Sequence, residues 1–86
     1  MFNLGQNYPN PFNPSTVIPF TLDQAGHARV RLYDTQGRLL RTLVDEHKAA
    51  GEHNIAFDMQ GLKSGVYLYE LVAGEQREIR KMMLLR

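Results

Sequence analysis

The chain has 86 residues, enough for one domain and too few for two. Its hydrophobic fraction of 43% excludes a disordered tail, and its net charge of +1 gives no general attraction to nucleic acid or to an anionic membrane. The absence of cysteine excludes disulfides, thiolate metal sites and cysteine nucleophiles, and no apolar run approaches the roughly 18–20 residues that a transmembrane segment needs.

Residues 7–14 are rich in proline and asparagine. Each proline fixes φ and pushes the residue before it toward extended geometry, which excludes a helix and a central strand. We expect an extended or polyproline-like segment in which Tyr8 and Phe12 are anchored in the core. With its flanking residues it makes up a lead segment, residues 1–16, that is predicted to pack on the rest of a single domain spanning residues 1–86.

The remaining sequence consists of short hydrophobic runs separated by turn signals, with no helical repeat. The runs that predict strands are residues 17–22, 28–33, 40–44, 52–58, 65–72 and 77–85. Residues 45–51 are interpreted as a polar connector. Short runs at roughly 8–12-residue spacing are typical of an antiparallel sandwich, so the predicted fold is all-β with about seven short strands.

The segment from Asp34 to Gly37 predicts a turn with Gly37 in the left-handed region. A three-residue loop keeps the inner face of the hairpin mostly apolar, whereas a slip of one residue would put Arg41 opposite Val30 in the core. The pairs predicted from this loop are Leu32 with Leu40, Val30 with Thr42, and Ala28 with Val44.

The run from Val66 to Val72 is β-branched and aromatic throughout, as expected of a central strand. Its alternation places Tyr67 and Tyr69 on one face and Leu68 with its apolar neighbours on the other. Gly74 then allows a tight turn, and the final run pairs with this strand.

Candidate catalytic and metal-binding side chains are few and scattered. The three histidines lack the paired spacing of a zinc motif, and the serines lie outside any nucleophile pattern. The aspartates fall at turns, where they bond to their own backbone. The sequence therefore predicts no metal, no cofactor and no enzyme. The histidines are His27, His47 and His53.

Two basic features have two interpretations each. Arg29 and Arg31 point away from the inner face, with Arg41 predicted opposite Arg31, and they form either a solvated surface, which we favour, or an anion-binding strip for acidic polysaccharide or lipid phosphate. The final basic run, residues 80–86, is either an ordinary strand guarded by basic residues or an edge that a partner reads by strand addition. The physical argument favours the ordinary strand.

The order of several motifs resembles one known family, the type IX secretion system (Por secretion) C-terminal sorting domain, type A. The resemblance starts at residues 4–16, Leu-Gly-Gln-Asn-Tyr-Pro-Asn-Pro-Phe-Asn-Pro-Ser-Thr, and continues through residues 30–34, 43–44, 51–53, 65–67 and 80–82. The family motif residues with a structural role are Asn7, Tyr8, Pro9, Asn10, Pro11, Phe12, Asn13, Pro14, Asp34 and Gly37.

The resemblance implies an immunoglobulin-like sandwich at the C-terminus of cargo exported by Bacteroidetes-type bacteria. Such cargo crosses the inner membrane by a separate N-terminal signal, here expected upstream of residue 1, and passes through the periplasm. The partners implied are an outer-membrane translocon and a sortase-like cysteine peptidase that removes the domain. The mature cargo is then secreted or stays at the cell surface, joined to anionic lipopolysaccharide.

The family signal is concentrated near the last strands. It corresponds here to Gly65, Val66, Tyr67, Lys81, Met82, Met83, Leu84, Leu85 and Arg86. The loop at residues 59–64 is shorter than is usual in the family, and flagellar-hook-capping domains share the shorter motifs. The alternative function is a carbohydrate-binding or adhesive module of a secreted glycanase.

Overall fold

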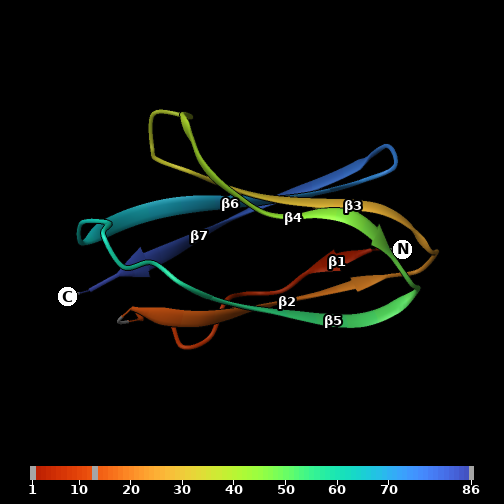
Figure 1. Ribbon diagram of the computed structural model, residues 1–86, viewed down its shortest axis with the longest axis horizontal. Helices are drawn as coiled ribbons and strands as arrows, with labels where there is room; N and C mark the ends of the chain where they lie inside the picture. Colours follow the sequence, from red (N-terminus) through yellow and green to blue (C-terminus); the bar gives the residue numbers. More distant parts are fainter. Residues whose placement is uncertain (1, 13, 86) are drawn as a thin grey trace.

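The computed structural model describes residues 2–12 and 14–85 (Figure 1). In these residues seven strands form two antiparallel sheets that pack face to face, and no helix is present. The three-stranded sheet has the order β1-β2-β5 and the four-stranded sheet the order β4-β3-β6-β7. This architecture confirms the predicted fold class. The strands are β1 (Asn3–Leu4), β2 (Ser15–Leu22), β3 (Gly26–Tyr33), β4 (Leu39–Lys48), β5 (Gly51–Asp58), β6 (Gly65–Ala73) and β7 (Gln76–Leu84).

Alternating side chains of the two sheets fill the space between them. Val30 and Leu32 of β3 are fully buried, as their alternation predicted. Tyr69 and Leu71 of β6 are also fully buried, and β6 lies between β3 and β7, which confirms it as a central strand. Burial of each side chain of this size stabilises the fold by about 1.5–3 kcal/mol, so each of these few core residues matters for the free energy of unfolding.

The β3–β4 hairpin has the predicted turn and a different register. Gly37 has φ +84, and the three-residue loop is closed where the Asp34 amide donates to the Arg38 carbonyl at 3.1 Å. Two bulges, one between Tyr33 and Leu32 and one between Arg31 and Val30, shift the pairing, so Leu32 lies opposite Arg41 and Val30 lies opposite Val44. The pairs predicted for Leu32, Val30 and Ala28 are therefore wrong. Between the two bulges the faces are exchanged, so Arg41 lies on the inner side and Thr42 on the outer side, opposite Arg31. After the second bulge Val44 is again on the inner face, opposite Val30.

The segment expected to be a polar connector is mostly strand. β4 continues to Lys48 and β5 begins at Gly51, so only residues 49 and 50 join the two sheets on this side. Gly51 has φ +118, which lets the chain change direction within this short connection. The connector prediction was wrong because the polar residues of an exposed edge strand give the same sequence pattern as a loop.

The lead segment anchors the sandwich through a different pair of residues from the predicted one. Phe12 is 2% exposed, as predicted, and it packs edge to face on Phe57. Tyr8 is 53% exposed, so its predicted burial is wrong, and Asn7 is buried in its place. Tyr8 pairs with Val17 of β2, and alternation then directs the side chains of neighbouring residues 7 and 8 to opposite sides.

Candidate recognition surface

The inner side of the last strand, β7, is part of the core. Met82 and Leu84 are almost fully buried, and they pair with Tyr67 and Gly65 of β6. Alternation places Lys81 and Met83 on the opposite, outer face of the sheet, where both are exposed. The family-implied recognition residues of β7 are thus divided between the core and the surface.

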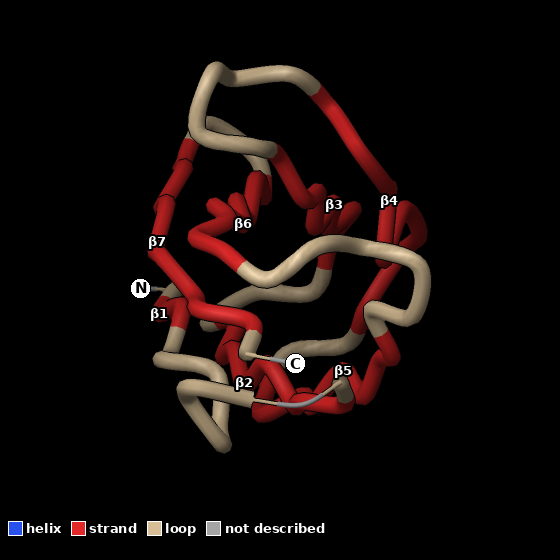
Figure 2. Tube along the Cα trace, turned by 90° about the vertical axis from the view of Figure 1, so that its left-hand side faces the viewer, coloured by secondary structure: helices blue, strands red, loops and turns tan. Residues whose placement is uncertain are grey.

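The outer edge of β7 is covered by the lead segment, which runs beside it (Figure 2). The Phe12 amide donates to the Met83 carbonyl at 3.0 Å, and the Leu85 amide donates to the Phe12 carbonyl at 2.9 Å. Asn10 Oδ1 accepts from the Met83 amide at 2.9 Å, and Gln6 Nε2 donates to the Lys81 carbonyl at 2.8 Å. Because these edge groups of residues 81–85 are already bonded, a partner cannot add a strand there without displacing the lead segment.

Two charged side chains hold the start of the lead segment against β7. Arg80 Nε donates to the Leu4 carbonyl, and Glu78 Oε1 accepts from the Leu4 amide at 3.4 Å. Both side chains belong to the inward-facing set of β7, where β1 lies alongside the strand (Figure 2). Contacts between the lead segment and β7 therefore extend from residue 78 to residue 85, as side-chain bonds at 78 and 80 and as bonds to the backbone edge from 81 to 85.

The hydroxyl of Tyr69 joins the lead segment to the centre of β6. It accepts from the Asn7 amide at 2.9 Å and donates to the Gly5 carbonyl at 2.8 Å. Burial raises the pKa of the Tyr69 hydroxyl against the opposing effect of the Asn7 amide. A Cβ at Gly5 would lie 2.7 Å from Cγ of Pro19, so this close approach requires glycine.

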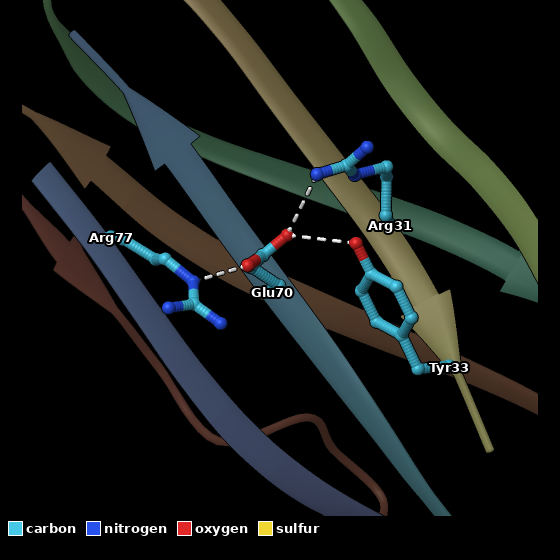
Figure 3. Close-up of polar contacts among 4 residues, drawn as sticks. All are labelled: Arg31, Tyr33, Glu70 and Arg77. Atoms are coloured by element: carbon cyan, nitrogen blue, oxygen red, sulfur yellow. Dashed lines mark hydrogen bonds and ion pairs between the residues drawn. The ribbon is translucent and has the colours of Figure 1, made fainter. Parts of the chain in front are cut away.

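A buried carboxylate, Glu70, lies at the centre of the outer face of the four-stranded sheet (Figure 3). The Glu70 side chain is 6% exposed. Its Oε1 accepts from Arg31 Nη2 at 3.2 Å and from the Tyr33 hydroxyl at 3.0 Å. Its Oε2 accepts from Arg77 Nε, which comes from β7. Burial opposes its ionisation, and the bonds from Arg77, Tyr33 and Arg31 outweigh burial, so the pKa of Glu70 lies below its ordinary value. Burial and the neighbouring carboxylate raise the pKa of Tyr33.

Glu70 is not among the site residues predicted from the sequence. Its sequence signal is a lone charged residue inside a run predicted to be a central strand, which requires a buried partner. The bonding role of Tyr69 carried no comparable signal, because its partners lie more than 60 positions away in the sequence.

The predicted arginine strip is only partly assembled. Arg31 reaches Glu70, and Arg29 lies on the same outer face by alternation. Arg41 lies opposite Leu32 and not opposite Arg31, so the predicted pairing is wrong. Arg41 donates instead to the backbone carbonyls of Asp58 and Gln60, at 3.3 and 3.2 Å, and so bridges the two sheets.

The other family-implied recognition residues lie at the start of β6 and after the end of β7. Gly65 begins β6 with φ +152, and Val66 is exposed beside Met83 on the outer face. Tyr67 is buried, and its hydroxyl donates to the Lys63 carbonyl. Leu85 is half exposed, and Arg86 lies outside the described residues.

The family motif residues of the lead segment and the first hairpin have structural contacts. Asp34 Oδ1 accepts from the amides of Gln36 and Arg38, at 2.9 and 3.0 Å, and these bonds, led by that of the Arg38 amide, lower the pKa of Asp34. The carbonyls of Pro9 and Pro14 accept from Thr16 Oγ1 and the Met59 amide. The peptide bonds before Pro9 and Pro11 are cis, and Asn13 lies outside the described residues.

Polar side chains elsewhere do not converge. His27 contacts Asp45 at 2.5 Å, and His53 bonds to the Ala49 carbonyl at 2.7 Å. Across residues 2–12 and 14–85, no three histidine or acidic side chains are grouped as metal ligands would be. That same part of the chain contains no helix able to span a membrane.

Comparisons with known proteins agree with the architecture. Residues 6–85 match the family described as the secretion system C-terminal sorting domain. The fold is similar to part of dimeric latent PorU from Porphyromonas gingivalis (TM-score 0.74, 18% identity, 99% of this chain and 9% of that chain). It is also similar to part of PorZ, a surface component of the type IX secretion system of the same organism (TM-score 0.66, 24% identity, 94% and 11% of the two chains).

The chain spans about a tenth of each of these two proteins, and at these identities the likeness concerns the fold. A search of curated protein sequences found no match. The family match covers nearly the whole chain, including the lead segment from Gln6 and the last strand. The chain belongs to the family of type IX secretion C-terminal sorting domains.

Proposed function

We propose that this domain directs the export of an upstream cargo across the outer membrane by the type IX secretion system, followed by sorting at the cell surface. The observation that carries the proposal is the family match over residues 6–85. Residues 1–86 act together as one domain in this proposal, with the lead segment (1–16) as part of it. The bonds between residues 4–12 and β7 support this extent.

The domain acts as a substrate of the export apparatus and not as an enzyme. In support, Glu70 and Asp34 are engaged in bonds that organise the fold, and Asp45 and His27 contact each other. The partners are the outer-membrane translocon and a sortase-like cysteine peptidase. The cargo passes through the periplasm and ends secreted or joined to anionic lipopolysaccharide at the surface.

The recognition residues fall into two groups with different roles. The exposed ones contact the apparatus, and the buried ones hold the last two strands in the shape that is recognised. The exposed group is Val66, Lys81, Met83 and Leu85, and the group that shapes the strands is Gly65, Tyr67, Met82 and Leu84. Arg86, the last residue of the recognition set, is proposed to contact the apparatus as well.

The test is the location of a reporter that is delivered to the periplasm and carries residues 1–86 at its C-terminus. In a type IX-competent strain we expect the reporter in the medium or on the cell surface. The same reporter without the domain, and the fusion in a strain that lacks the type IX apparatus, should both stay periplasmic. A fusion retained in the periplasm of the competent strain at the level of the bare reporter would contradict the proposal.

A further inference from the structure

The outer face of the four-stranded sheet carries a group of exposed hydrophobic side chains. Leu39, Val66, Ile79 and Met83 lie on this face by pairing and alternation, and they are between 37% and 52% exposed. Val66 and Met83 are directly paired across β6 and β7, where side chains on one face are in contact distance. A hydrophobic patch that stays exposed in the folded domain is typical of a surface that binds another molecule.

The same face has an excess of positive charge. Its strands direct four cations outward, namely Arg29, Arg31, Arg77 and Lys81, against two carboxylates, Glu70 and Asp45. The excess of two positive charges compares with a net charge of +1 for the whole chain. Since Glu70 is buried and Asp45 contacts His27, the surface that a partner meets is mainly hydrophobic and cationic.

The outer face of the three-stranded sheet has the opposite balance of charge. The outward residues of β2 are Ser15, Val17, Pro19 and Thr21, and those of β5 are Glu52, Asn54, Ala56 and Asp58. These strands expose small or polar side chains and two carboxylates, and direct no cation outward. Tyr8 of the lead segment, which is 53% exposed and paired with Val17, adds one large side chain to this face, and its hydroxyl donates to Asn54 Oδ1 at 3.5 Å. The two faces of one small domain therefore differ above all in charge.

From this asymmetry we infer that the outer face of the four-stranded sheet docks on a protein partner whose surface combines a hydrophobic area with surrounding carboxylates. The inference rests on the proposed function and adds which face the apparatus contacts. It involves residues outside the family-implied set, above all Ile79 and Arg77. Methionine and arginine beside a hydrophobic centre are enriched in protein interfaces, and complementary charges favour an acidic partner.

A protein fits this face better than a lipid phosphate or an acidic polysaccharide does. An anion-binding strip would need unpaired cations side by side, yet Glu70 lies between Arg31 and Arg77 and pairs with both. Arg41, the third member of the predicted strip, bonds to the opposite sheet. Ile79 and Met83 would stay in water under a bound polysaccharide, whereas a protein interface buries them.

The test uses the reporter fusion with paired substitutions on the two faces. The double variant Ile79→Ser, Met83→Ser and the charge variant Lys81→Glu change exposed side chains on the docking face. The controls on the opposite face are the double variant Val17→Ser, Ala56→Ser, at two paired outward residues, and the charge variant Glu52→Lys. We expect the docking-face variants to lose about tenfold in export rate and the controls to match the unchanged domain. Circular dichroism and melting of each purified domain verify folding.

A second measurement identifies the class of partner. A photo-reactive benzoylphenylalanine replaces Ile79, or Ala56 as the control, in the exporting strain. We expect a protein adduct of defined mass from position 79 and none from position 56, and the adduct should decrease when Lys81→Glu is added.

The inference fails if folded docking-face variants export like the unchanged domain, or if position 79 gives no protein adduct. It also fails if that position forms only lipopolysaccharide adducts and the purified domain binds phosphatidylglycerol vesicles through Lys81. Retention of the unchanged fusion in the periplasm would instead count against the proposed function, so the two failures are distinguishable.

Discussion

The two edge strands of the four-stranded sheet, β4 and β7, are protected in different ways. β4 carries two bulges and mostly exposed or half-buried side chains, so its own irregularity makes it a poor template for another strand. β7 pairs regularly with β6 along its whole length, and its free edge is covered by the lead segment. The first protection is local, whereas the second depends on residues more than 70 positions away.

This difference indicates that the two ends of the described chain form one structural unit. The lead segment donates to and accepts from the edge of β7, while Phe12 and Leu84 pair within the core. Residues proposed to carry the sorting signal are thus held in place by residues of the family's opening motif. Damage to the cover of β7 should therefore cost much more than damage to β4.

The largest effect is expected from Phe12→Ala. The substitution removes a buried ring and the packing on Phe57, and it should lower the free energy of unfolding by about 3–5 kcal/mol in urea denaturation followed by circular dichroism. Hydrogen exchange should accelerate at the amides of Met83 and Leu85, whose edge contacts the lead segment supplies. Unchanged protection of those two amides would show that the lead segment is not their cover.

The next effect is expected from Tyr69→Phe, which keeps the ring and removes the hydroxyl. The buried Asn7 amide then loses its partner, at a cost of about 1–3 kcal/mol in the free energy of unfolding. Tyr67→Phe is the matched control. The Tyr67 hydroxyl donates to the carbonyl of Lys63 in an exposed loop, where water can replace it, so the loss of stability should be smaller. Equal losses for the two variants would contradict the role of Tyr69 in holding the lead segment.

A pH-dependent effect is expected from Glu70, whose network joins β7 to β3 and includes no residue of β4. Its pKa in the folded domain lies below the ordinary value near 4.5, so the unfolded chain binds more protons as the solution is acidified. Stability from this group is therefore complete above that value and is lost as the pH falls through the folded-state pKa.

The measurement is urea unfolding of Glu70→Gln and of the unchanged domain across this pH range. The variant should be less stable by about 1–3 kcal/mol at neutral pH and should lose less stability on acidification. Glu75→Gln, in the exposed turn, should keep the acid response of the unchanged domain. Parallel acid responses of Glu70→Gln and the unchanged domain would exclude Glu70 as a source of the dependence.

The smallest effect is expected on β4. Leu40 occupies the first bulge and is 37% exposed, so Leu40→Ala should change the free energy of unfolding by only about 0.5 kcal/mol. Leu84→Ala, on the inner side of β7, is the matched comparison and should cost about 2–5 kcal/mol. Similar losses at the two leucines would show that the two edges are not protected differently.

Much of the fold follows from local sequence patterns. Alternation places Val30, Leu32 and Tyr69 in the core, and glycine at positions 37 and 74 fits two turns that require positive φ. The bulges of β4 could not be predicted, because their effects cancel: Leu39 and Val44, on either side of them, keep the predicted faces, and only Arg41 and Thr42 between them exchange faces. β1, with two residues, is too short for any periodic signal.

The candidate site was less predictable than the fold. The resemblance pointed to β6 and β7, but the division of their residues between core and surface depends on the register of the last hairpin. The cover over the edge of β7 comes from contacts across the whole chain, which no local pattern encodes. In the lead segment the prolines leave no periodic run that shows which side faces inward, so the burial of Asn7 and the exposure of Tyr8 follow only from the pairing of Tyr8 with Val17.

The most direct test of the account is the fraction of reporter found outside the cell when residues 1–86 follow it in a type IX-competent strain. We expect most of the fusion to be extracellular or surface-bound, and we expect Phe12→Ala, which uncovers the last strand, to keep the reporter in the periplasm. An unchanged fusion that remains periplasmic, in amounts equal to the reporter alone, would contradict it.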